Sequence, residues 1–224
     1  MTNLQKRILT SIIVMPLSIF FILKGGYILL FFLFGIFFLA NYELFPVSNN
    51  KRIIIFFDLA LILSLYSIYF LADKESESLY LLLWIIILVV CSDIGGYVFG
   101  KTFKWKKLTK ISPKKTLSGV FGSFILSIFS VFIASVILPK INYYFTHIES
   151  LNINFLEPKF FFLSIILSIV AQSGDLTISY FKRLEKIKDT GKILPGHGGI
   201  FDRIDALMFV VILTLILYQL KIIP

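Results

Sequence analysis

Hydrophobic residues form long runs along this chain, and short polar segments separate them. Seven runs are each about 20 residues long, the length at which an α-helix crosses the hydrocarbon core of a bilayer. They cover residues 8–24, 26–45, 53–72, 79–100, 117–138, 160–181 and 204–222. The pattern predicts an all-α, polytopic integral membrane helical bundle with about seven transmembrane helices, and more if short or re-entrant segments are counted.

Composition points to the same class of protein. The chain has 224 residues, of which 58% are hydrophobic, and its mean hydropathy is +0.90. So short a soluble protein would have too little polar sequence to cover seven apolar helices. The only cysteine, Cys91, lies inside an apolar run, which leaves neither a disulfide nor a cysteine-based metal site. We divide the chain into N-terminal transmembrane helices, 1–78, and a region with the candidate chemistry, 79–224.

The basic residues are distributed unevenly between the two sides of the predicted bundle. With the N-terminus inside, 17 of the 22 Lys and Arg residues lie on one side and 5 on the other. Most of the 17 belong to the loops 101–116 and 182–203, which the positive-inside rule places in the cytoplasm. This asymmetry explains the net charge of +9 without a nucleic-acid partner. The loop 139–159, rich in Phe and Tyr, is expected to lie along the membrane interface.

Three carboxylates stand out within the predicted spans, where ionised groups are costly and therefore have a partner or a task. Asp93 and Asp175 each lie seven residues before the cytoplasmic end of a span, about 10 Å below the surface at 1.5 Å per residue. Asp58 is also near a cytoplasmic end. Each carboxylate could instead form a structural ion pair with a lysine, and for Asp58 neither interpretation is favoured.

Helical spacing groups some of these polar residues. Asp175, Ser179 and Lys182 are at positions i, i+4 and i+7, so they share one helical face. Such a stripe is expected to face the bundle interior or a water-filled cleft. In the fourth span, Asp93 shares a face with two glycines, which permit close packing of a neighbouring helix.

The stretch Leu194-Pro-Gly-His-Gly-Gly-Ile-Phe-Asp-Arg-Ile-Asp205 separates two apolar runs. Its glycines and proline end one helix and let backbone amides face outward. The next helix should begin near Phe201. A glycine-rich turn that leads into the N-terminus of a helix is suited to binding phosphate. Asp202 and Asp205 would lie on one side of that helix, where carboxylates suit Mg²⁺. Alternatively, Asp202 is a helix N-cap. His197 could donate a hydrogen bond to phosphate, which we favour, act as a base, or be a solvated loop residue.

The other basic loop contains a compact group of hydrogen-bond donors directly before a helix. These are Ser112, Lys114, Lys115 and Thr116. The loop could act only as a topology signal that attracts anionic headgroups. We favour phosphate binding because the donors are so close together.

The run from Ser179 to Asp205 resembles the signature of the phosphatidate cytidylyltransferase family, also called CDP-diacylglycerol synthases. The family pattern S-x-[apolar]-K-R-x₄-K-D-x-G-x₂-L-P-x-H-G-G-[apolar]-x-D-R-[apolar]-D is matched at every fixed position over 27 residues. The stretches 92–97, 112–116 and 172–175 also resemble family features. No G-x₄-G-K-[ST] or H-E-x-x-H motif occurs, so neither a P-loop ATPase nor a zinc hydrolase is supported.

The resemblance implies transfer of the cytidylyl group of CTP to phosphatidate, giving CDP-diacylglycerol and pyrophosphate, with Mg²⁺ as cofactor and one or two cations. It implies a bacterial inner (plasma) membrane protein with a cytoplasmic active site, and a homodimer. We assign Asp175 and Asp202 as metal ligands. The other candidate catalytic residues are Lys182, Arg183, His197 and Asp205. The candidate substrate-binding residues are Asp93, Ser112, Lys114, Lys115, Ser179, Lys188, Asp189, Gly198, Gly199 and Arg203.

Other functions are compatible with parts of this pattern. Carboxylates in spans and helices interrupted by glycine also occur in cation-coupled transporters. Against a transporter, the polar groups of this chain are concentrated near the cytoplasmic side. A cytidylyltransferase with another lipid acceptor, such as an isoprenoid ether lipid, is a second alternative, and a headgroup-binding membrane protein is a third.

Overall fold

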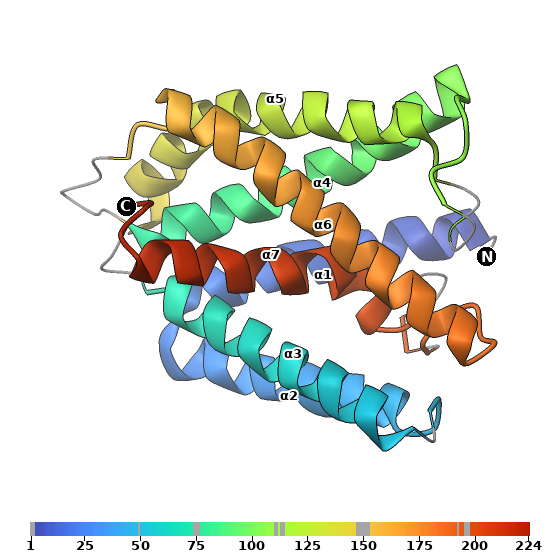
Figure 1. Cartoon of the computed structure of the whole chain (residues 1–224). Coiled ribbons are helices and arrows are strands. Elements are labelled where there is room, and N and C mark those ends of the chain that lie inside the picture. Colours follow the sequence, from blue (N-terminus) through green and yellow to red (C-terminus); the bar gives the residue numbers. More distant parts are fainter. Residues whose placement is uncertain are drawn as a thin grey trace.

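The computed structural model contains seven α-helices and a short π-helix within the part of the chain that it describes (Figure 1). The described residues are 3–48, 50–73, 77–109, 112, 115–146, 153–191, 193–194 and 198–224. The helices are α1 (Asn3–Lys24), α2 (Gly26–Leu44), α3 (Lys51–Leu71), α4 (Ser78–Phe103), α5 (Leu117–Ile141), η1 (Asn142–Thr146), α6 (Pro158–Leu184) and α7 (Phe201–Gln219).

Each predicted apolar run corresponds to one α-helix, which confirms the all-α prediction. By length and composition, five helical segments in the described chain, α2 to α6, can cross a membrane, with η1 continuing α5. A shorter apolar segment, Ile12–Lys24, lies in α1. Helix α7 has 19 residues and carries Asp202, Arg203 and Asp205 near its beginning. These helices make the chain an integral membrane protein.

The helices run alternately in opposite directions (Figure 1). The N-terminus and the connections α2–α3, α4–α5 and α6–α7 lie at one end of the bundle, and the C-terminus lies at the other. The two basic loops, 101–116 and 182–203, therefore belong to the same end, as the predicted threading requires. We call this the basic end of the bundle.

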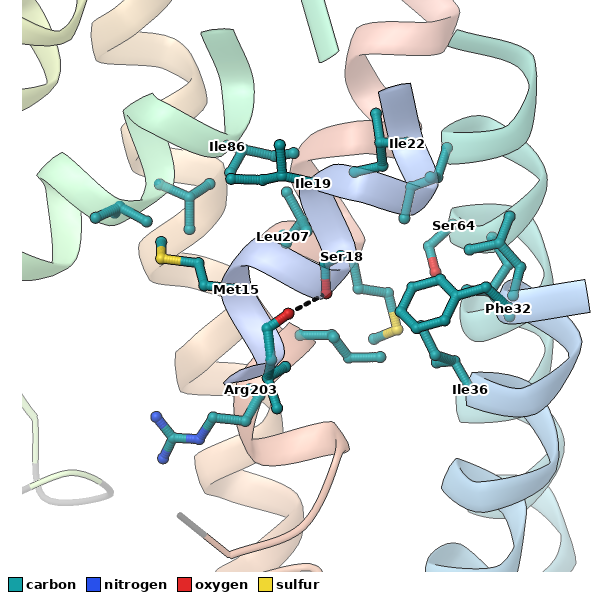
Figure 2. Close-up of a pocket in the computed structure, with 18 of the residues that line it drawn as sticks. Met15, Ser18, Ile19, Ile22, Phe32, Ile36, Ser64, Ile86, Arg203 and Leu207 are labelled. Atoms are coloured by element: carbon teal, nitrogen blue, oxygen red, sulfur yellow. Dashed lines mark hydrogen bonds between the residues drawn. The ribbon is translucent and has the colours of Figure 1, made fainter. Parts of the chain in front are cut away.

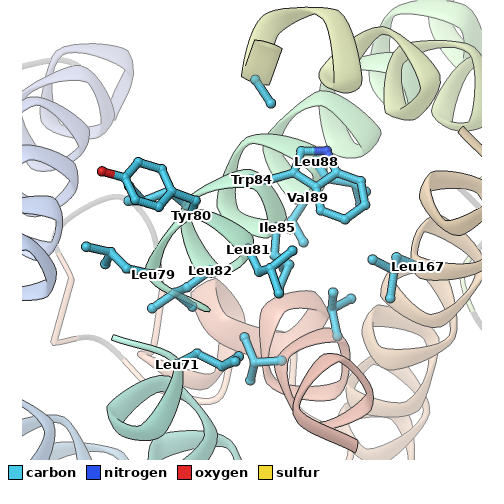
Figure 3. Close-up of a cluster of buried hydrophobic side chains, with 14 of the residues drawn as sticks. Leu71, Leu79, Tyr80, Leu81, Leu82, Trp84, Ile85, Leu88, Val89 and Leu167 are labelled. Carbon is cyan, nitrogen blue, oxygen red and sulfur yellow. The ribbon is translucent and has the colours of Figure 1, made fainter. Parts of the chain in front are cut away.

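Helix α4 forms the centre of the hydrophobic core. The side chains of its first half are buried on all sides, including Tyr80, Trp84 and Leu88 (Figure 3). A helix that is apolar all round is expected to be buried in this way. A second cluster joins α2, α3, α6 and α7, where the ring of Phe57 lies 4.7 Å from that of Phe181. The first cluster thus fixes α6 and α7 beside α4, and the second fixes them beside α2 and α3.

Small residues bring α4 and α5 into close contact. A Cβ added at Gly95 would overlap the carbonyl oxygen of Gly122, so the two backbones touch. The Ser123 hydroxyl donates to the carbonyl oxygen of Ser92 at 2.8 Å. The two glycines predicted to share a face with Asp93 also approach this region, because a Cβ at Gly96 would lie 2.9 Å from Ser123 Oγ and one at Gly100 would lie 3.1 Å from Thr116 Oγ1. The beginning of α5 therefore lies beside Asp93.

The aromatic loop that follows α5 begins with the π-helix η1. Its residues Tyr143, Tyr144 and Phe145 are exposed. Tyr80 of α4 donates to the Asn142 side chain at 2.9 Å, which attaches this segment to the core. That the segment lies along a membrane interface stays a prediction.

Candidate active site

A charged cavity of about 360 Å³ lies among α4, α6, α7 and the loop before α7. Because Asp175 and Lys182 are seven residues apart on α6, both side chains face it from the same side. The hydroxyl of Ser179, between them, donates to Asp175 Oδ1 at 3.3 Å. The sequence therefore gathers these groups in the predicted way. The residues that line the cavity are Asp93, Asp175, Lys182, Asp189, Asp202, Arg203 and Asp205.

Asp202 connects α6, α7 and the loop between them. Its Oδ1 accepts from Lys182 Nζ at 2.6 Å, in an ion pair whose two side chains are 5% and 15% exposed. Its Oδ2 accepts from the Thr190 amide at 2.8 Å and from the Thr190 hydroxyl and the Gly199 amide at 3.0 Å each. Burial opposes ionisation, but hydrogen bonds from Lys182, Gly199 and Thr190 outweigh it and lower the pKa of Asp202.

The N-cap interpretation of Asp202 is wrong. Helix α7 begins at Phe201 as predicted, its N-cap residue is Ile200, and Asp202 lies in the first turn. Its carboxylate instead accepts from the loop and from α6. Asp202 therefore fixes a tertiary arrangement rather than only a helix end.

The backbone amides of the loop also differ from the prediction. The amide of Gly199 donates to Asp202, and the amide of Ile200 donates to the side chain of Glu43 at 2.6 Å. The amide of Leu194 donates to the Gly198 carbonyl at 3.1 Å. These amides point into the protein, because buried backbone donors need acceptors. These three amides therefore do not form the predicted phosphate cradle.

Lys115 brings the basic loop 101–116 into the site. Its Nζ forms an ion pair with Asp175 Oδ2 at 2.7 Å and donates to the carbonyl oxygen of Gln172 at 3.3 Å. Backbone hydrogen bonds between Leu108 and Lys115 and between Leu117 and Lys106 hold the loop in place. Asp175 thus forms an ion pair, which was the alternative to a metal ligand. Its lysine partner comes from the loop 101–116 and not from α6 itself.

A second polar cavity of about 280 Å³ lies between α4, α5 and α6 and shares Asp93 and Asp175 with the charged cavity. Ser112 and Lys115 line it, as their predicted contact with substrate requires. The side chain of Thr116 caps α5 by accepting from the Gly119 amide at 3.2 Å. The two polar cavities therefore form adjoining parts of one site.

An apolar cavity of about 330 Å³ adjoins the charged one, and Asp93 and Arg203 line both. Its other lining residues come mainly from α1, α2, α3, α4 and α7, and include Met15, Phe32 and Leu207. Figure 2 shows Arg203 at one end of this cavity, with its guanidinium group pointing away from the apolar side chains. Five aspartates line the charged cavity against two cations, so a molecule with an apolar tail and an anionic head would match this pair of cavities only together with a metal cation.

Not every predicted residue lines these cavities. Arg183 and Lys188 are exposed and lie outside all three. Gly198 and Gly199 lie against Asp202, and Gly198 has φ +88°, which favours glycine. Lys114 and His197 are outside the described residues.

Two residues of this region are missing from the sequence-based prediction. Glu43, near the end of α2, is a buried carboxylate in an apolar run, the same signal that singled out Asp93. Thr190, which is 2% exposed, had no local signal.

Asp58 lies on α3 and has one buried oxygen without a hydrogen-bond partner in the described part of the chain. None of the ion pairs found there includes it.

The donor set for a metal ion consists of carboxylates from three helices. Among the described residues, no three Asp, Glu, His or Cys side chains are close enough together to hold a cation alone. Asp175 is paired with Lys115, and Asp202 with Lys182. Mg²⁺ often takes only one or two carboxylates, with waters and substrate phosphates completing its shell. The residues therefore fit a cation that arrives with a nucleotide better than a resident one.

Fold and site together define a helical integral membrane protein with a charged site at the basic end of the bundle and an adjoining apolar cavity. The charged and the apolar cavity share Asp93 and Arg203 in their walls. The family model for the cytidylyltransferase family matches residues 47–221, and the chain belongs to this family.

Curated relatives agree with this assignment. A phosphatidate cytidylyltransferase of Rickettsia typhi is 37% identical over 210 residues, which are 92% of this chain and 88% of the relative. One from Rickettsia conorii is 35% identical over 99% of this chain and 92% of the relative. One from Staphylococcus haemolyticus is 41% identical over 68% of this chain and 54% of the relative.

Proposed function

We propose that this protein transfers the cytidylyl group of CTP to phosphatidate, giving CDP-diacylglycerol and pyrophosphate. The family and the relatives support this reaction. The observation that carries it is the shared wall of the charged and apolar cavities, formed by Asp93 and Arg203. It lets the phosphate of a lipid lie beside the triphosphate of CTP while the acyl chains stay in an apolar environment.

In the reaction, a phosphate oxygen of phosphatidate attacks the α-phosphorus of CTP, and the bond to the β-phosphate breaks. The attacking oxygen is already anionic at neutral pH, so the protein needs to supply little base catalysis. Positioning and charge neutralisation then lower most of the barrier, as in other phosphoryl transfers. Lys182, Lys115 and Arg203 are the cations that we assign to the phosphates.

We assign Asp175 and Asp202 to hold Mg²⁺, with Asp93 and Asp205 beside them. Bound Mg²⁺ would neutralise charge on the triphosphate and the leaving pyrophosphate. Lys115 and Lys182 now neutralise these two carboxylates. Both lysines would exchange their carboxylate partners for phosphate oxygens when the nucleotide enters with its cation.

We place the protein in a bacterial inner membrane with the site facing the cytoplasm, where CTP is found. The basic loops at the site end support this orientation through the positive-inside rule. The homodimer implied by the resemblance stays a prediction. A measurement of the molar mass of the protein in detergent would test it.

The test is an assay of the purified full chain with CTP and phosphatidate. We expect pyrophosphate release and formation of CDP-diacylglycerol, both abolished by EDTA and restored by Mg²⁺. Activity with an isoprenoid ether lipid phosphate but not with phosphatidate would show that the acceptor is the ether lipid. Cation flux in liposomes without pyrophosphate release would instead support the transporter.

A further inference from the structure

Glu43 of α2 accepts hydrogen bonds from the loop of the charged site. It lies in the last turn of α2, and 4% of the residue is exposed. Its Oε1 accepts from the Ile193 amide at 3.1 Å, and its Oε2 accepts from the Ile200 amide at 2.6 Å. These donors are 150 and 157 residues away in the sequence. The carboxylate therefore links an N-terminal helix to the signature loop.

Two glycines of the signature make room for this carboxylate. A Cβ at Gly191 would overlap Glu43 Oε1, and a Cβ at Gly199 would lie 2.6 Å from Oε2. Neither glycine has a positive φ that would by itself require glycine. Close approach of the Glu43 side chain is therefore a physical reason for both residues.

The loop is held between two carboxylates. The neighbouring amides of Gly199 and Ile200 donate to different partners, Asp202 of α7 and Glu43 of α2. On the other strand of the loop, Thr190 donates to Asp202, while Ile193 donates to Glu43. Both ends of the segment 194–198 are thereby fixed.

We propose that Glu43 is a positioning residue that holds the described part of the glycine loop (residues 189–191, 193–194 and 198–200) beside Asp202, in the arrangement with which the charged cavity binds CTP. This inference rests on the proposed function, because it assigns the charged cavity to the nucleotide. Glu43 lines none of the three cavities described above, so it acts through the loop and not by contact with substrate. It also lies outside the residues matched by the family model, 47–221.

The Glu43→Gln variant tests this role with little change in shape. Glutamine has one acceptor oxygen where glutamate has two, so one of the two loop amides would face an NH₂ group. A buried donor without an acceptor is unfavourable, and the loop should move to satisfy it. Displacement of a binding group on the order of 1 Å can cost about 10²-fold in rate.

The matched control is Ser48→Ala. Ser48 follows α2, is buried, and donates to Glu185 Oε1 at 2.6 Å, so it also ties the end of this helix to the C-terminal half without touching the loop. We expect Glu43→Gln to raise the KM for CTP about 10- to 100-fold. The KM for phosphatidate should change by less than about twofold, and Ser48→Ala should leave both constants near those of the wild type.

An unchanged KM for CTP in Glu43→Gln would overturn the proposal, as would equal changes in both KM values. Hydrogen–deuterium exchange of peptides containing Ile193 and Ile200 gives a readout without turnover, and exchange there should be faster in Glu43→Gln. Equal exchange in wild type and variant would also overturn it. If the wild type releases no pyrophosphate, the proposed function fails, and the exchange result still decides whether Glu43 holds the loop. If Glu43→Gln does not fold, Glu43→Asp tests the same contacts. Its side chain is one methylene shorter, so its carboxylate would lie farther from the amides of Ile193 and Ile200.

Discussion

The substitution Asp202→Asn removes one carboxylate oxygen from a site where both oxygens are used. If the new NH₂ group faces Lys182, the ion pair at 2.6 Å is lost. If it faces the loop, the amides of Thr190 and Gly199 lose their acceptor. Either way a buried donor is left opposite another donor.

The size of the effect follows from burial. Loss of one partner of a buried ion pair costs about 3–5 kcal/mol, and a buried donor left without an acceptor costs about 1–3 kcal/mol. Because the side chains of Asp202 and Lys182 are only 5% and 15% exposed, we expect about 3 kcal/mol of lost stability. Typical domains have about 5–15 kcal/mol, so most of the variant should stay folded.

The assay combines thermal unfolding in detergent with pyrophosphate release. We expect a lower unfolding midpoint for Asp202→Asn and loss of turnover even where the protein is folded, since a neutral amide is a poor Mg²⁺ ligand. The control is Glu157→Gln, which breaks an exposed ion pair with Lys159. It should change neither quantity, because exposed pairs contribute about 0–1 kcal/mol. Wild-type stability and activity in Asp202→Asn would refute both the stabilising role of these Asp202 contacts and the assignment of Asp202 as a metal ligand.

Three further predictions concern other parts of the molecule. Asp175→Asn should abolish Mg²⁺-dependent turnover and Asp175→Glu should reduce it about 10²-fold; full activity of the Glu variant would leave Asp175 only as the ion-pair partner of Lys115. In a Cys91→Ser background, Lys106→Cys and Lys188→Cys should resist an impermeant thiol reagent in sealed cells and react after permeabilisation, and labelling of sealed cells would reverse the topology. Gly122→Ala should lower the unfolding midpoint, because its Cβ would lie 2.5 Å from the Gly95 carbonyl oxygen and overpacking costs about 1–3 kcal/mol; an unchanged midpoint would contradict the close α4–α5 contact.

The helices and much of the site follow from local patterns along the chain. In a bilayer the protein itself must satisfy every backbone polar group, and an apolar run of about 20 residues does so as an α-helix. The seven runs therefore predicted α1 to α7, with α4 and α6 each continuing three residues beyond the predicted cytoplasmic end. Helical period also placed Asp175 and Lys182 on one face, and Asp202 and Asp205 near each other, because such spacings are local.

The contacts between charged groups of different helices and loops depend on how the helices pack. The lysine beside Asp175 comes from the loop before α5, and the second carboxylate of the glycine loop, Glu43, comes from α2, 150 residues before the amide of Ile193. Helical period relates positions within one helix and carries no information about which helices pack together. That choice depends on side-chain volume and close backbone contact, as at Gly95 and Gly122, and these interactions form only when the whole bundle is assembled.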